Sequence, residues 1–374
     1  MQKARFIIAL AVFLFIAFAI PFLANLLPDH TRTLANAPEI ISKAYIDRVV
    51  NYMVCGKKPD IVVAGSSLVI FPHVLTDGYF EKAPVPIPDP IEYADFLTNY
   101  VEMAHFKRVL SVKANSVVDL GVPSLMLTDC DLLFEKMQMN ESLPRVAILM
   151  LAPRDFMDNT VAVDRNLFLH EVAGRNTLKE IFNSGSAGLF QAKLIQSMSY
   201  GANAWAKQFR SGGQRVLLAV RKLGRKPKAI STGSISHEQA LHYFYFGDGK
   251  MADLGVYKKR YNPPDYARIK EQITALGRVL DRLKSASVKT IVVSMPLTRE
   301  NVSLIAPSAY EEIQNGMKTT CAEKSVAFLA ADDLGRFEKS DFVDSVHLNA
   351  EGGDRFFKQL AKLIGPDLRS VFRL

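Results

Sequence analysis

Five short apolar runs recur along the chain between residues 60 and 332, and each ends in small or polar residues. Nearly continuous apolar runs, unlike alternating ones, are typical of strands that are buried on both faces of a parallel sheet. The pattern therefore predicts five parallel strands with helices covering both faces of the sheet. These runs are 60–65 (DIVVAG), 116–121 (SVVDLG), 145–152 (RVAILMLA), 289–296 (KTIVVSMP) and 326–332 (VAFLAAD).

Between and around these runs, apolar positions follow helical spacing. Strands that alternate with helices predict a doubly wound α/β domain of the flavodoxin-like kind, in which ligands bind beyond the carboxyl ends of the strands. Active residues are therefore expected to follow strands directly. The predicted helices cover 40–53, 92–109, 265–285, 307–324 and 351–363.

An uncharged stretch near the amino terminus predicts a membrane anchor. Residues 6–27 carry no charge and follow Lys3 and Arg5. As a helix this stretch is about 33 Å long at 1.5 Å per residue, which is sufficient to cross a bilayer. We expect one transmembrane anchor over 1–29, followed by a juxtamembrane linker and helix over 30–56.

The orientation of the anchor follows from its basic first residues, which tend to stay in the cytoplasm. The chain from about residue 30 onward is then expected to face the periplasm or the outside, as a single-pass protein of the inner membrane. The small-x-small pattern at 17–19 leaves a cleaved secretory signal as the alternative.

The predicted α/β domain over 57–374 is interrupted at about 159–262 by a stretch that lacks a core strand and is expected to be mainly helical and basic. The sequence at 215–228, RVLLAVRKLGRKPK, is its most basic part. It can form a solvated face, or an amphipathic element that contacts anionic lipid or a membrane partner. With a formal net charge of +8 on an outward-facing domain, a membrane surface or an anionic polymer is a better partner than nucleic acid.

The remaining composition indicates neither a metal nor a cofactor. The chain has no histidine cluster, no HExxH motif and no Walker-type glycine loop. Cys55, Cys130 and Cys321 show no CxxC spacing. One disulfide is possible in any of three pairings, but three buried thiols are favoured, because free cysteine is commonly buried.

Three residues in two of the predicted loops suggest nucleophilic catalysis. Ser67 follows the first strand in GSSL, and Asp344 and His347 follow the fifth strand in DSVH, just before the last helix. A serine needs an imidazole to take its proton, and a carboxylate can orient that imidazole. We therefore predict a Ser67–His347–Asp344 triad. His73 is expected to lie in a loop leaving the site rather than to act as the base.

Acyl transfer also needs hydrogen-bond donors for an oxyanion. Candidates follow the second and third strands, where the chain reads Gly121-Val-Pro-Ser124 and Ala152-Pro-Arg154-Asp155. We expect Gly121, Ser124 and Arg154 to line the crevice as oxyanion or substrate-binding residues.

These motifs resemble those of the SGNH/GDSL hydrolases over residues 57–365. GSSL resembles the GDSL block with serine in the aspartate position, and DSVH matches the DxxH block. The resemblance implies that Ser67 is the nucleophile and an oxyanion donor, that His347 is the general base, and that Asp344 orients it. Gly121 or Ser124 falls where the family has its oxyanion glycine.

The third block departs from the family pattern. Where the family usually has GxND, Arg154 stands in the position of the oxyanion asparagine. A guanidinium could stabilise an oxyanion electrostatically, or it could bind a phosphate or carboxylate of an acidic substrate.

The anchor, the outward domain and the basic insertion together resemble anchored SGNH-like proteins such as the D-alanylation protein of teichoic acids and the alginate O-acetylation proteins. Those proteins work beside membrane-bound acyltransferases. The resemblance implies a serine esterase or O-acyltransferase that acts on acyl esters of an envelope or exported polysaccharide through an acyl-Ser67 intermediate.

Two alternatives remain open. The chain could be a non-catalytic scaffold that grips an anionic polymer or a membrane partner through Arg154 and the basic insertion, because a fold does not guarantee a function. It could also be a secreted esterase, released by cleavage near Ala19.

Overall fold

The computed structural model describes residues 37–54, 57–86, 90–160, 237–247, 251 and 253–372. The predicted membrane span, Cys55 and the basic stretch 215–228 lie outside the described residues. No helix among the described residues is both long enough and apolar enough to cross a membrane. The chain divides into two compact units, and the fold described below is that of the unit formed by 39–172 and 235–374.

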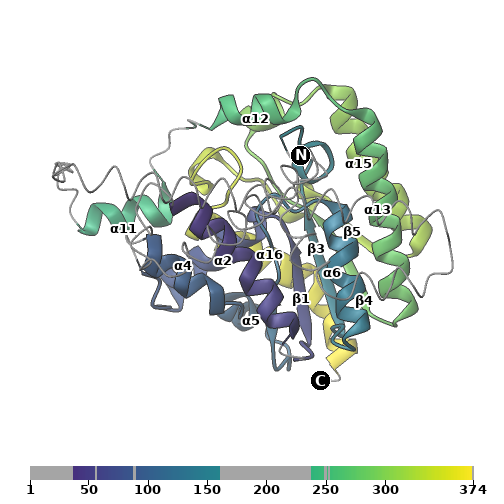
Figure 1. The fold of residues 1–374 in the computed structure, drawn as a ribbon, viewed down its shortest axis with the longest axis horizontal. Helices are drawn as coiled ribbons and strands as arrows, with labels where there is room; N and C mark the ends of the chain where they lie inside the picture. Colours follow the sequence, from purple (N-terminus) through teal and green to yellow (C-terminus); the bar gives the residue numbers. More distant parts are fainter. Residues whose placement is uncertain are drawn as a thin grey trace, which may run out of the picture. The chain divides into compact units, whose positions relative to one another are not determined.

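A five-stranded sheet forms the centre of this unit (Figure 1). All four strand pairings are parallel, and the strand order is β2-β1-β3-β4-β5, as in flavodoxin-like sheets. All five predicted strands are thus confirmed. The strands are β1 (Ile61–Gly65), β2 (Val117–Asp119), β3 (Val146–Leu151), β4 (Lys289–Ser294) and β5 (Ala327–Leu329).

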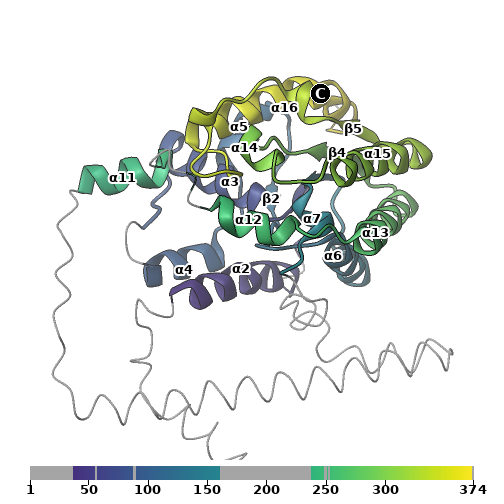
Figure 2. The ribbon, with the colours of Figure 1, turned by 90° about the horizontal axis from the view of Figure 1, so that it is seen from above.

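Helices cover both faces of the sheet. Helices α3, α5 and α16 contact one another on one face, whereas α6 and α13 lie on the other, with α15 packed against α13 (Figure 2). The helices are α2 (Ala37–Val54), α3 (Ser67–Phe80), α4 (Pro90–Asn99), α5 (Ala104–Leu110), α6 (Leu127–Met139), α7 (Arg154–Met157), α11 (His237–Phe246), α12 (Leu254–Tyr261), α13 (Tyr266–Ser285), α14 (Arg299–Val302), α15 (Pro307–Lys324) and α16 (Ala350–Phe372).

The prediction of one helix over 92–109 is wrong, because the chain forms α4 and α5 with a break between them. In the break, the Met103 N–H donates to the Val117 carbonyl at 2.9 Å, and the Asp119 N–H donates to the Val101 carbonyl at 2.8 Å. Since β2 is an edge strand, its outer polar groups need partners. Val101 and Met103, in the break between the helices, supply them.

The prediction for His73 is also wrong. It lies inside α3 rather than in a loop, and its side chain is fully buried. Helix α16 extends nine residues beyond its predicted end at 363, to Phe372. In the predicted insertion, the described segments after residue 236 are helical, as α11 and α12.

Two glycines allow the close approaches that bring the site together. A Cβ on Gly65 would overlap the Met150 carbonyl oxygen, so the end of β1 can lie against β3 only without a side chain. A Cβ on Gly353 would lie 3.0 Å from the Pro72 Cβ and 2.9 Å from the Thr76 Cγ2. Helix α16 therefore packs directly on α3, the helix that starts at the end of β1.

Candidate active site

The structure brings Ser67, His347 and Asp344 together. The His347 Nε2 lies 2.8 Å from the Ser67 Oγ, and the His347 Nδ1 lies 2.6 Å from an Asp344 carboxylate oxygen. An ionised carboxylate only accepts hydrogen bonds, so Nδ1 carries a hydrogen and Nε2 is left to accept the Ser67 hydroxyl. This is the arrangement in which an imidazole can take the serine proton.

Asp344 is held in its ionised form. Its second carboxylate oxygen accepts the N–H groups of Val346 and His347 at 2.9 and 2.8 Å. Burial raises the pKa of Asp344, but the electrostatic attraction of the His347 ring and these hydrogen bonds lower it by more, so the net pKa is below its usual value. The carboxylate can therefore hold the imidazole in one orientation.

The helix that carries the serine also supports the imidazole. Phe71 lies one turn after Ser67 on α3 and stacks on the His347 ring, with centroids 4.0 Å apart and planes inclined by 20°. His347 is only 8% exposed, whereas Ser67 is half-buried. The ring is thus fixed by packing on one side and by the carboxylate on the other. No sequence motif indicates Phe71.

Ser67, Gly121 and Ser124 are candidate oxyanion donors, and they differ in the hydrogen bonds that they already make. Ser67 is the first residue of α3, and the first N–H groups of a helix have no intrahelical acceptor and carry partial positive charge. The Gly121 N–H already donates to an Asp119 carboxylate oxygen at 2.6 Å. Ser124 has a φ of 64° and accepts a hydrogen bond from the Arg154 Nη1 at 3.3 Å.

The Ser124–Arg154 hydrogen bond spans the end of β1. Ser124 follows β2 and Arg154 follows β3, and β1 lies between these two strands in the sheet. The bond that joins them therefore crosses the edge at which β1 ends and Ser67 begins α3. Because the Ser124 oxygen accepts from Arg154, its own hydrogen remains available for donation.

Arg154 is buried among carboxylates rather than open to a large anion. It is 4% exposed, its Nη2 lies 3.2 Å from Asp155, and its Nη1 lies 3.6 Å from Asp158. Burial lowers the pKa of Arg154, but Asp155 and Asp158 raise it, and the net pKa is above the usual value. Arg260 also binds Asp158, at 2.6 Å, so two cations balance two carboxylates. The cluster holds Arg154 in place against Ser124.

Helix α12 lies beside this cluster, and the sequence analysis did not assign it to the site. Burial raises the pKa of Tyr257 to about 12, with Arg154 lowering it and Asp344 raising it. The Tyr257 hydroxyl therefore interacts electrostatically with both Arg154 and Asp344. In the sequence, the spacing of four residues between Asp253, Tyr257 and Tyr261 indicates only that these side chains share one face of a helix.

A buried ionic network lies behind the site. The His73 Nδ1 lies 2.8 Å from the Asp119 carboxylate, and its Nε2 lies 2.9 Å from the Glu102 carbonyl and 3.4 Å from Asp77. Both ring nitrogens face acceptors, so both donate and the ring is charged. Burial lowers the pKa of His73, but Asp119 and Asp77 raise it more, to about 9. Arg48 pairs with Asp119 at 3.2 Å.

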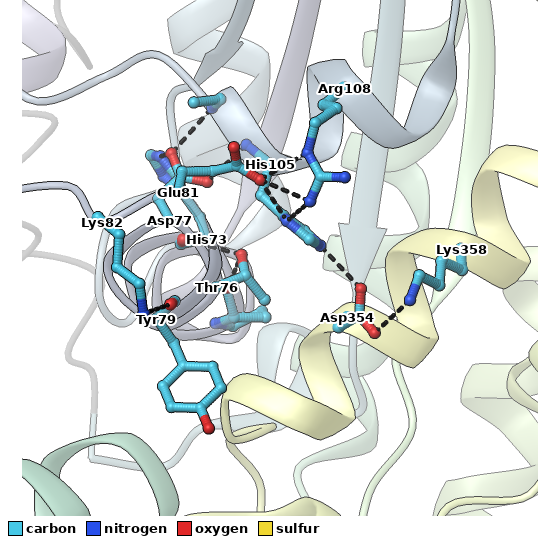
Figure 3. A network of polar contacts seen from close by, with 12 residues as sticks. His73, Thr76, Asp77, Tyr79, Glu81, Lys82, His105, Arg108, Asp354 and Lys358 are labelled. Carbon is cyan, nitrogen blue, oxygen red and sulfur yellow. Dashed lines mark hydrogen bonds and ion pairs between the residues drawn. The ribbon is translucent and has the colours of Figure 1, made fainter.

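A second histidine joins three helices on the same face of the sheet (Figure 3). The His105 Nδ1 lies 2.9 Å from Glu81, and its Nε2 lies 2.9 Å from Asp354. Glu81 caps the end of α3, His105 lies on α5 and Asp354 on α16. The network thus connects the helix that begins with Ser67 to the helix that follows His347.

Other predicted features have plain outcomes. Cys130 and Cys321 are free and buried, as favoured from the sequence. Within the described residues, no three His, Cys, Asp or Glu side chains gather so that they could hold a metal ion.

No protein-family model matches the chain, and no curated protein matches it. The function is therefore inferred from the motifs and the geometry of the site.

Proposed function

We propose that this protein is a membrane-anchored serine esterase or O-acyltransferase of the SGNH/GDSL type. The observation that supports the proposal most strongly is the hydrogen-bonded chain Ser67–His347–Asp344, whose two distances are 2.8 and 2.6 Å. The strand order β2-β1-β3-β4-β5 agrees with the flavodoxin-like sheet expected of that type. Ser67 and His347 both lie beyond the carboxyl ends of strands, where ligands bind in such sheets.

In the first half of the reaction, the Ser67 Oγ attacks the carbonyl carbon of an ester while its proton passes to the His347 Nε2. The carbonyl oxygen becomes negative and accepts hydrogen bonds from the Ser67 N–H and the Ser124 hydroxyl. The C–O bond to the leaving alcohol then breaks as His347 returns the proton to that alcohol oxygen. An acyl ester on Ser67 remains.

In the second half, water or a sugar hydroxyl attacks the acyl carbon, and His347 takes the proton of the attacking group. The bond to Ser67 breaks, and His347 protonates the Ser67 oxygen. Water gives a carboxylic acid and hence hydrolysis, whereas a sugar hydroxyl gives a new ester and hence transfer. Throughout, Asp344 stabilises the imidazolium and holds its orientation.

The proposed location and substrate class are inferred from the amino-terminal sequence. The uncharged run 6–27 behind two basic residues supports an inner-membrane anchor with the α/β unit facing the periplasm or outside. An enzyme tethered there meets cell-envelope and exported polysaccharides, whose acyl esters are the proposed substrates. A membrane-bound acyltransferase is the proposed partner.

A second candidate function is a non-catalytic scaffold for such an acyltransferase. The observation that favours it is the altered oxyanion region, because Arg154 replaces the family's asparagine and the Gly121 N–H is already bonded. A scaffold would not need an activated serine.

A fluorophosphonate probe separates the two functions, because it reacts only with an activated serine. The full-length protein in mild detergent is treated with the probe, together with Ser67→Ala and His347→Ala variants, and the label is located by mass spectrometry. We expect label on Ser67 of the wild type and none on either variant. The neighbouring Ser66, which is fully buried, is the internal control and should stay unlabelled. A folded wild type without label would favour the scaffold.

A further inference from the structure

We infer that Asp253 is a positioning residue for the triad, acting through Ser345. The inference rests on the proposed function, because it concerns how the Asp344–His347 pair is held. Ser345 lies between the two triad residues in DSVH, and Asp253 lies 92 positions earlier, at the start of α12.

The contact between the two side chains is direct. The Ser345 hydroxyl donates to an Asp253 carboxylate oxygen at 2.5 Å, and the Ser345 backbone nitrogen lies 3.3 Å from both carboxylate oxygens. Ser345 is fully buried. A hydrogen bond to an ionised group is stronger than one between neutral groups, so this contact holds the backbone of Ser345 as well as its side chain.

The Asp253 carboxylate is diverted from its usual local role. Asp253 is the N-cap of α12, a position where aspartate commonly accepts an N–H of its own helix, but its side chain makes no such bond. Asp265, the N-cap of the next helix, does accept the Arg268 N–H, at 3.0 Å. Asp253 therefore stabilises the triad loop rather than its own helix.

Ser345 is also held by the N-cap of α14 and by a residue inside that helix. The Asn301 side-chain amide donates to the Ser345 hydroxyl oxygen at 2.9 Å, and the Thr298 hydroxyl donates to the Ser345 carbonyl at 2.7 Å. Asn301 in turn accepts the Tyr261 hydroxyl at 2.9 Å, from the other end of α12. These groups are buried, so loss of one partner would leave the others unsatisfied and free to shift.

The consequence for the triad is geometric. The backbone N–H of Val346 and the side chain of Asp344 flank Ser345, and the two are bonded to each other at 2.9 Å. A shift of Ser345 therefore moves the carboxylate that holds His347. Gly247 packs against Val343 on the other side of Asp344, where a Cβ would overlap the Val343 carbonyl oxygen. Gly247 and Asp253 thus contact the loop on either side of Asp344.

The experiment compares Asp253→Ala, Asp253→Asn and the matched control Asp265→Ala in the full-length protein. Probe labelling of Ser67, kcat and KM for p-nitrophenyl acetate, and thermal unfolding are measured for each. We expect Asp253→Ala to lower the labelling rate and kcat by roughly tenfold or more, because small misplacements of catalytic groups are costly. KM should stay within about twofold, because a residue that acts through Ser345 positions the reacting groups rather than binding the substrate.

The two other variants separate positioning from general damage. Asn retains one oxygen that can accept the Ser345 hydroxyl but lacks the charge, so Asp253→Asn should recover about threefold of the lost rate and stay about threefold below wild type. Asp265→Ala, which loses a true cap, should lower thermal stability while labelling at the wild-type rate.

The outcomes distinguish this inference from the proposed function. An unlabelled wild type overturns the proposed function and this inference with it. A labelled wild type with Asp253→Ala labelled at the same rate overturns the inference alone. If Asp253→Ala does not fold, labelling of Asp253→Asn decides: a wild-type rate overturns the inference, and a rate lowered by about threefold supports it.

Discussion

Replacing His73 by asparagine tests whether the buried network behind the site is charged. The network consists of two carboxylates and two cations, all fully buried: Asp77, Asp119, Arg48 and His73. When all four are ionised, their charges balance. Asparagine can still donate to a carboxylate but carries no charge, so one carboxylate would lose its counterion. Breaking a buried pair in this way costs about 3–5 kcal/mol of folding free energy.

The raised pKa of His73 gives a second value for the folding free energy that its charge contributes. Its rise from 6.5 to about 9 in the folded protein corresponds to about 3 kcal/mol of stabilisation. Since the folded-state pKa is raised, this stabilisation is fully present below pH 6.5 and is lost as the pH rises through about 9. The free-energy difference between wild type and His73→Asn should therefore shrink by about 3 kcal/mol between pH 6 and pH 10.

Urea unfolding of the full-length protein in mild detergent, followed by circular dichroism at both pH values, measures this difference. The control is Arg336→Gln, which breaks the exposed Arg336–Glu338 pair and should change stability by about 0–1 kcal/mol at either pH. If His73→Asn lowers the unfolding free energy by less than about 1 kcal/mol at pH 6, or by the same amount at pH 10, His73 does not carry a stabilising charge.

Three further predictions follow from single contacts. Gly352→Ala should lower the unfolding free energy by more than about 1 kcal/mol, measured by urea titration, because a Cβ there would overlap the Asp341 carbonyl oxygen. Arg154→Gln should cost about 3–5 kcal/mol, seen as a lower melting temperature, since Asp155 loses its ion-pair partner while Asp158 keeps Arg260; an unchanged melting temperature would contradict the ion-pair account. Asp344→Asn should keep the fold but lower the Ser67 labelling rate by roughly a thousandfold or more, as expected when the imidazole adopts the wrong tautomer, and labelling at the wild-type rate would exclude its orienting role.

The sheet and the meeting of Ser67 with His347 could be predicted from sequence for one physical reason. Strands buried on both faces have nearly continuous apolar runs, and the carboxyl ends of parallel strands share one edge. Residues that follow two such strands therefore meet even when 280 positions separate them, as Ser67 and His347 do.

The features that escaped prediction are tertiary. The break between α4 and α5 exists because β2 is an edge strand whose outer backbone groups need hydrogen-bond partners. The sequence of residues 100–103 does not indicate this pairing. His73 lies in a helix that is apolar on nearly every side and contains Pro72, so helical spacing was hidden. The Asp253–Ser345 contact joins residues 92 positions apart, and only the structure reveals it.

In the proposed mechanism Ser67 carries the acyl group during the reaction. This can be measured by rapid mixing of the full-length protein with p-nitrophenyl acetate, following nitrophenolate release and the intact mass, with Ser67→Ala as the control. We expect a burst of nitrophenolate matched by one acetyl group per protein, located on Ser67 and missing from the variant. A folded wild type that shows no burst and carries no acetyl group on Ser67 would contradict it.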